Sequence, residues 1–130
     1  MGMKVFSGGK RKKCIVVNLS ALDTAGGVVS IANPESAEIL ITEVLFILGT
    51  KSTNASTVDV GVAANGTTLS QTLMTGIDTG AAAARFDNIN DAGGSGGRDR
   101  VWASTQFITA SKASGACAGL AGQIVVNYVV

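Results

Sequence analysis

The reactive side chains of this sequence are few, and their spacing does not match any catalytic arrangement. The 130 residues include no histidine, which removes the Ser-His-Asp and Cys-His nucleophiles and the usual general base. Cys14 and Cys117 are two widely spaced cysteines and cannot complete a four-thiolate zinc site. The glycine-rich stretch GGSGG, residues 93–97, lacks the Gly-Lys-Ser/Thr ending of a phosphate-binding loop and the GxGxxG spacing of a dinucleotide site. We therefore assign no catalytic or cofactor-binding residue and do not expect an enzyme.

Residues 87–91, DNIND, resemble the start of a calcium-binding loop. The alternate ligand positions would be Asp87, Ile89 and Asp91, and the apolar middle residue breaks the pattern. Carboxylate and amide oxygens suit hard cations, so a different cation site built from Asp87, Asn90 and Asp91 stays open as an alternative. The prediction is an exposed loop without a metal.

Basic residues are concentrated near the N-terminus. Half of the ten basic residues precede the first acidic residue, Asp23, and the remaining body holds five basic and nine acidic residues, a net charge of −4. Such a cluster is a solvated tail, a docking segment for an acidic protein surface or a nucleic-acid contact. Nucleic acid is disfavoured because the body is acidic and lacks basic residues interleaved with stacking aromatics. We assign binding of a protein partner to Lys10, Arg11, Lys12 and Lys13.

Neither secretion nor membrane insertion is indicated by the apolar runs. The run after the basic cluster, CIVVNL at residues 14–19, is six residues long and includes Asn18, whereas a signal peptide needs a core of about 7–15. No run approaches the roughly 20 apolar residues of a spanning helix. A soluble, uncleaved chain is expected. Free thiols are expected at Cys14 and Cys117, and a disulfide between them stays open as the alternative.

Short apolar runs separated by turn residues make up the rest of the chain. They are CIVVNL (14–19), GGVVSIA (26–32), EILITEVLFIL (38–48), TVDVGVA (57–63), RVWASTQFITAS (100–111) and GQIVVNYVV (122–130). With no credible long helix, this pattern predicts an all-β fold: an antiparallel, jelly-roll-like β-sandwich of about seven or eight strands. The predicted organisation is a flexible basic arm, residues 1–13, and a single sandwich domain, residues 14–130.

One hairpin is predicted from a local signal. Val58, Val60 and Val62 alternate with smaller or polar residues, and Asn65-Gly66 is the dipeptide that favours a type I′ turn, in which both central residues have positive φ. The return strand would begin at Thr67. The alternative is a wider loop that contains the same dipeptide.

The run at residues 38–48 is apolar on both faces of the strand that it predicts. Alternation places Ile39, Ile41, Leu45 and Ile47 on one face and Leu40, Val44, Phe46 and Leu48 on the other. The opposite sheet of a sandwich covers one face, and a loop, the arm or another subunit must cover the second. Only 15% of the residues are charged and only six are aromatic, so a thin core would gain from burial against a copy. We predict a homo-oligomer whose interface includes Leu40, Val44, Phe46 and Leu48.

Three segments together resemble a known family. ILITEVLFIL (39–48), TVDVGVAANGTTL (57–69) and the closing GQIVVNYVV (122–130) lie in a small Gly/Ala/Ser/Thr-rich chain with an arm and no catalytic groups. In style, residues 14–130 resemble the decoration, or head-stabilising, proteins of tailed bacteriophages. The resemblance implies a trimer or similar oligomer that sits on an icosahedral shell and clamps neighbouring capsid subunits. It further implies the major capsid protein or another virion protein as partner, and a place in the virion, assembled in the host cytoplasm, with no membrane and no cofactor.

Two other functions stay open beside this resemblance. The first is a tail, neck or fibre subunit of a phage built on the same sandwich. The second is a carbohydrate-binding module, for which Trp102 and Tyr128 are the candidate aromatic platforms. The family has no fixed motif, so no binding residue is transferred from it to this chain.

Overall fold

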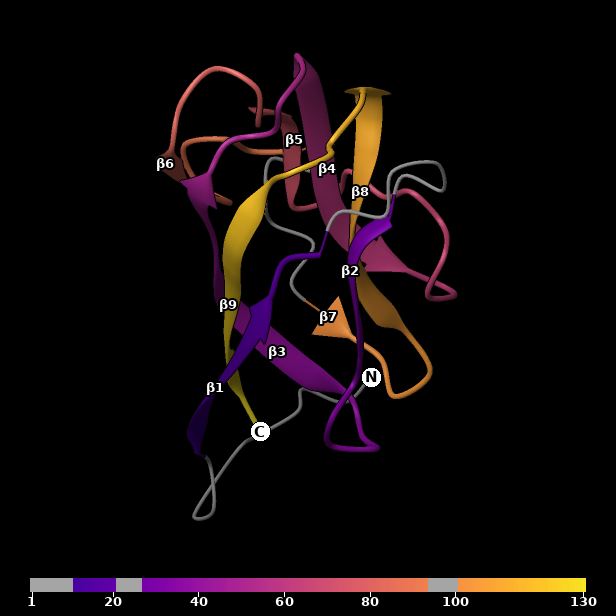
Figure 1. Cartoon of the computed structure of the whole chain (residues 1–130). Coiled ribbons are helices and arrows are strands. Elements are labelled where there is room, and N and C mark those ends of the chain that lie inside the picture. Colours follow the sequence, from indigo (N-terminus) through magenta and orange to yellow (C-terminus); the bar gives the residue numbers. More distant parts are fainter. Residues whose placement is uncertain (1–10, 21–26, 94–100) are drawn as a thin grey trace.

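All regular elements in the described part of the chain are β-strands (Figure 1). The computed structural model describes residues 11–20, 27–93 and 101–130. The strands are β1 (Lys12–Asn18), β2 (Gly27–Ala32), β3 (Ile39–Thr50), β4 (Ser56–Ala63), β5 (Met74–Asp78), β6 (Ala84–Asp87), β7 (Val101–Trp102), β8 (Phe107–Gly115) and β9 (Ala121–Val129). Among these residues no helix has the length and hydrophobicity needed to cross a membrane.

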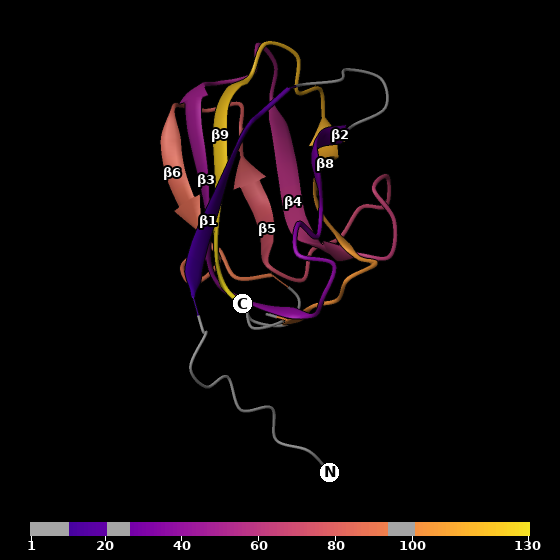
Figure 2. The same cartoon turned by 90° about the horizontal axis from the view of Figure 1, so that it is seen from below.

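The strands form two antiparallel sheets that pack face to face, which confirms the predicted β-sandwich (Figure 2). One sheet has the order β1-β9-β3-β6, with β7 also paired to β3, and the other has the order β2-β8-β4-β5. Each sheet joins strands that are far apart in sequence: β1 pairs with β9 in one sheet, and β2 pairs with β8 in the other. The last strand is thus needed to hold the first one in place.

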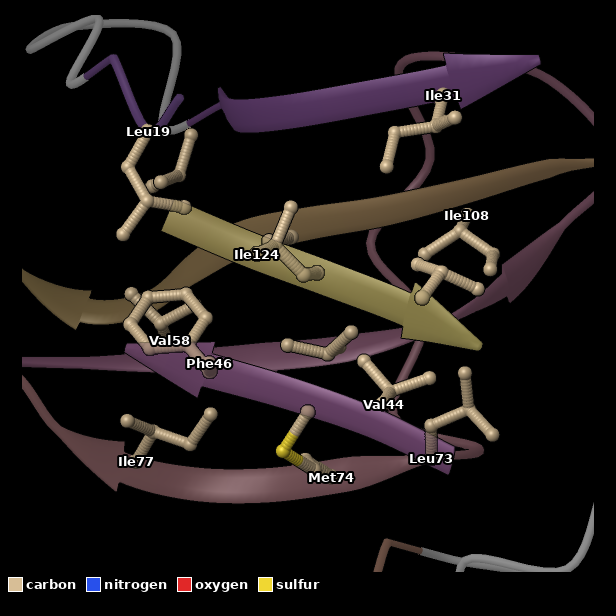
Figure 3. Packing of buried hydrophobic residues seen from close by; sticks show 14 of the residues in the cluster. Leu19, Ile31, Val44, Phe46, Val58, Leu73, Met74, Ile77, Ile108 and Ile124 are labelled. Atoms are coloured by element: carbon tan, nitrogen blue, oxygen red, sulfur yellow. The ribbon is translucent and has the colours of Figure 1, made fainter. Parts of the chain in front are cut away.

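The core lies between the two sheets and includes alternate residues of β3, β4 and β9. Phe46 of β3 and Ile124 of β9 face Val58 of β4 and Ile108 of β8 across the sandwich (Figure 3). Each buried side chain of this kind stabilises the fold by about 1.5–3 kcal/mol relative to the exposed side chain. Aliphatic residues supply most of the cluster, in line with the low aromatic content of the chain.

The two-face assignment predicted for residues 38–48 is wrong because β3 contains a bulge. Ile39 and Ile41 are buried, and after the bulge the buried residues are Val44, Phe46 and Leu48. The pairing of β3 with β9 shifts register between Ile41 and Glu43, and one extra residue moves every later side chain to the other face. A prediction that assumes strict alternation along the strand therefore assigns inner and outer residues to the same face.

The type I′ hairpin predicted at Asn65-Gly66 is also wrong. Neither residue has positive φ, and the return strand β5 begins only at Met74. The Asn65 side chain instead accepts hydrogen bonds from the Thr67 amide (3.0 Å) and from the Thr68 hydroxyl (2.7 Å). Asparagine forms such side-chain turns readily, so the wider loop is the correct alternative.

The connection between β4 and β5 crosses the outside of β4. The Ser70 hydroxyl donates to the Val62 carbonyl (2.9 Å), and the Val62 amide donates to the Thr72 hydroxyl (2.9 Å). These hydroxyls replace a partner strand. Gly61 is required under this crossing, because a Cβ there would lie 2.2 Å from the Ser70 hydroxyl oxygen.

Candidate interaction surfaces

The predicted basic cluster is divided between different environments. Lys10 lies outside the described residues, and Arg11 and Lys12 are exposed. Lys12 and Lys13 belong to β1, paired with Val129 and Tyr128, so the sandwich begins before residue 14. The charged side chains that face solvent from the described part of the cluster are Arg11 and Lys12.

Lys13 forms an intramolecular salt bridge with Glu35, which lies in the connection between β2 and β3. The Lys13 ammonium donates to both carboxylate oxygens of Glu35, at 3.2 Å to Oε1 and 3.0 Å to Oε2. The Tyr128 hydroxyl donates to Glu35 Oε2 at 2.8 Å. The hydrogen bond from Lys13, followed by that from Tyr128, holds the pKa of Glu35 below its ordinary value. Lys13 thus serves the fold, and its ammonium is not free for a partner.

Trp102 and Tyr128, the candidate sugar platforms, are buried rather than exposed. Their rings meet edge to face with centroids 6.4 Å apart, and the indole N–H donates to the Gln106 carbonyl at 3.0 Å. Burial, followed by the hydrogen bond to Glu35, raises the pKa of Tyr128 to about 12. Neither ring offers a face to a sugar, so this carbohydrate-platform prediction is wrong for both residues.

The DNIND segment is a turn stabilised by its own carboxylates. Asp87 Oδ1 accepts from the amides of Ile89 (2.8 Å) and Asn90 (2.7 Å), and Asp91 Oδ2 accepts from the Asp87 amide (3.1 Å). The backbone and side-chain hydrogen bonds from Asn90 hold the pKa of Asp87 below its ordinary value. The described residues contain no group of three or more His, Cys, Asp or Glu placed to hold a metal.

Asn88 is a residue that sequence reasoning missed. Its side chain is fully buried. The side-chain oxygen Oδ1 accepts a hydrogen bond from the Val44 main-chain amide at 3.0 Å, and the main-chain amide of Asn88 donates to the Val44 carbonyl at 3.3 Å. Asn88 thereby pairs with β3 just after the bulge. The polar surroundings of Asn88 in the sequence predicted an exposed loop, and only the burial reveals its role.

The outer face of the β1-β9-β3 sheet carries apolar side chains that the chain leaves open. Val16 pairs with Val125, which pairs with Leu45, so three apolar residues form one row across the sheet. Leu40 pairs with Val129 on one side and Val101 on the other. The exposed fractions are 53% for Val16, 40% for Leu40 and 47% for Val101. The outer apolar face, as we name it, consists of Val16, Leu40, Leu45, Ile47, Val101, Val125 and Val129.

Of the four predicted interface residues, only Leu40 lies on this outer apolar face. Val44, Phe46 and Leu48 fill the chain's own core and cannot meet another subunit in this fold. Leu45 and Ile47 take their place on the outside and are half-buried. The prediction that this strand presents an apolar face stays as a prediction, with its residues changed.

Two hollows and two thiols are further features of the described residues. A hollow of about 230 Å³ lies between β2 and Gly66-Thr67, and its lining has no titratable side chain. Another, of about 330 Å³, adjoins Lys12, Glu43 and Asn127. Cys14 is exposed on β1 and Cys117 is buried, and both are free thiols. Neither of these two hollows is lined by a nucleophile together with a base and a third group that orients the base, which is the arrangement that nucleophilic catalysis requires.

The fold is that of a chain found in a phage capsid. It matches a chain in the structure titled "Capsid of Ralstonia phage GP4" with a TM-score of 0.54 and 16% sequence identity, over 99% of this chain and 90% of that one. A chain in "Cyanophage Pam1 capsid asymmetric unit" matches with a TM-score of 0.47 and 17% identity, over 99% and 89%. No family model and no curated protein matches the sequence. At this identity the likeness concerns the fold.

Proposed function

We propose that this chain is a non-enzymatic structural protein of a phage virion, and specifically a decoration protein that binds the outside of the head and stabilises the shell. The observation that carries the proposal is the shared fold with a phage capsid chain over 99% of this chain. The described surface offers exposed apolar side chains and the cations Arg11 and Lys12, which a structural protein can use for contact with other subunits. The partner would be the major capsid protein or another virion protein.

Self-association is the second part of the proposal. The outer apolar face would be covered by a second copy, in a homo-oligomer for which we propose a trimer. Large apolar patches are uncommon on monomers and mark contact sites. Leu40→Glu should lower the oligomer mass measured by light scattering. Leu69→Glu is the matched control, because Leu69 is 49% exposed on the other side of the sandwich, and equal effects of the two variants would argue against this face.

Attachment to the shell would use the exposed cations that precede and begin β1. Arg11 and Lys12 lie next to the sequence segment that holds Lys10. Exposed ion pairs contribute about 0–1 kcal/mol each and are screened by salt, but many copies on one particle add up. Arg11→Gln with Lys12→Gln should weaken attachment at low salt and change it little at high salt. If the double variant attaches as tightly as the wild type at every salt concentration, Arg11 and Lys12 do not contribute to attachment.

The decisive experiment separates heads from tails of a phage that encodes the chain and locates the protein by mass spectrometry. Its presence on heads, together with earlier DNA release on heating from particles made without it, supports decoration. Presence in the tail fraction supports the tail, neck or fibre alternative. Absence from both fractions overturns the virion proposal.

A further inference from the structure

The free edge of β1 offers a row of main-chain groups to a partner strand. The Leu19 amide donates to the Gly122 carbonyl and the Val130 amide donates to the Arg11 carbonyl, so odd-numbered residues of β1 exchange hydrogen bonds with β9. In an antiparallel ladder alternate residues bond to opposite sides. The main-chain N–H and C=O groups of Lys12, Cys14, Val16 and Asn18 therefore point away from β9, where no described residue accepts or donates to them.

The chain covers parts of two other edges with its own segments. Beside β5, the Thr75 amide donates to the Asp91 carbonyl and the Gly93 amide donates to the Leu73 carbonyl, both at 3.1 Å. Beside β2, the Ser20 amide donates to the Val28 carbonyl at 3.1 Å. An open edge is a template for another strand, and natural proteins usually block it. Along the seven residues of β1, no described segment provides such a cover.

We propose that the free edge of β1 pairs with β1 of a second copy, antiparallel about a two-fold axis, so that the two β1-β9-β3-β6 sheets become continuous. This proposal is independent of a role on a phage head. It uses the main-chain edge rather than the outer apolar face, so one chain can form both contacts. Addition of a strand to a sheet edge is an established mode of recognition.

The register follows from the hydrogen-bonding groups and the charges. Full use of the edge pairs Lys12 with the copy's Asn18 and Cys14 with the copy's Val16, and the axis passes between the two Ile15 residues. The cations then lie at opposite ends of the ribbon, whereas a parallel arrangement would place like charges side by side. Ile15, which is half-buried in one chain, would meet the copy's Ile15 and lose further contact with water.

Amide hydrogen exchange on the wild-type protein tests the pairing directly. The amides of Ile15 and Val17 are bonded to β9 and should be protected at every concentration. The amides of Cys14 and Val16 should be protected at high concentration and exchange rapidly on dilution, because only a second copy covers them. Rapid exchange at Cys14 and Val16 in a sample that light scattering shows to be oligomeric would overturn the proposal, as would a monomer at every concentration.

A proline variant removes the donor without touching the internal ladder. Val16→Pro deletes an N–H that points to the free edge, a position at which proline is tolerated in a strand, and should abolish the two-fold contact while the fold persists. Val16→Thr is the matched control, because it changes the side chain and keeps the N–H. If circular dichroism shows that Val16→Pro is folded and the variant associates as the wild type does, the edge of β1 does not form the two-fold contact. If the variant does not fold, the hydrogen-exchange measurement alone tests the proposal.

Cross-linking tests the register. The proposed pairing leaves the two Cys14 residues diagonal to each other, about 7–8 Å apart, which suits a short bismaleimide and is long for a direct disulfide. Cys117 is buried and provides no competing thiol in the folded protein. A linked dimer that disappears in Cys14→Ser supports the register, and ready formation of a direct Cys14 disulfide would overturn it.

Discussion

Lys13 on β1 and Glu35 in the β2–β3 connection form a salt bridge with 3.0 Å between Nζ and Oε2. The contact joins the first strand of one sheet to the segment that leaves the other sheet. Tyr128 of β9 donates to the same carboxylate oxygen at 2.8 Å. Glu35 is therefore the residue at which three separate segments meet, and its charge stabilises their arrangement.

The first prediction concerns the pH dependence of this contact. The pKa of Glu35 is lowered from 4.5 in the folded chain, so its contribution to stability is present above that value and is lost as the pH falls through the folded pKa. Glu35→Gln should lower the melting temperature at neutral pH, and the difference from wild type should shrink in acid. Glu43→Gln makes the same chemical change at an exposed position, and an equal pH dependence in that control would contradict the role of Glu35.

The second prediction uses the single tyrosine of the chain. In the folded protein Tyr128 should ionise near pH 12 instead of its ordinary 10.0, as measured by tyrosinate absorbance. Because the folded pKa is raised, the stability from this group is complete below pH 10 and is lost as the pH rises through about 12. The same titration in denaturant should return the ordinary value. A folded-state midpoint near 10 would show that Tyr128 is neither buried nor bonded to Glu35.

The third prediction separates the inner and outer faces of β3. Leu48→Ala should reduce the free energy of unfolding by about 2–5 kcal/mol, because it opens a cavity in the core. Leu40→Ala should change it by about 0.5 kcal/mol or less in the monomer, because Leu40 is on the surface. Chemical denaturation of both variants at low concentration provides the comparison. A large loss in Leu40→Ala with a small one in Leu48→Ala would mean that the bulge is misplaced.

The fourth prediction concerns Asn88. Asn88→Ala should destabilise the fold by about 1–3 kcal/mol, because the Val44 amide would be left buried without its acceptor. Asn90→Ala removes a hydrogen bond of 2.7 Å to Asp87 at an exposed site and should cost less, since water can replace it. Denaturant unfolding of the two variants measures the difference. If Asn90→Ala is the more harmful, the DNIND turn rather than the tie to β3 carries the stability.

The fold class and the limits on chemistry could be predicted from the amino-acid sequence. Alternating apolar residues and closely spaced turn residues are local properties, and they predicted a β-sandwich that the structure confirms. The absence of histidine and the spacing of Cys14 and Cys117 excluded the commonest nucleophilic and zinc sites without any coordinates. The division of charge between the N-terminal cluster and the acidic body was likewise readable from the residues alone.

Which side chains are available to a partner depends on long-range packing and could not be predicted in this way. The bulge of β3 depends on pairing with β9 and on Asn88, which lies 44 positions from Val44, and no local period contains that information. In the same way Lys13 reads as part of a free cationic cluster until Glu35 is placed beside it. The choice between a sugar platform and a core residue for Trp102 depends on its burial against Tyr128. Contacts between residues far apart in the chain set exposure, and exposure separates an interface residue from a core residue.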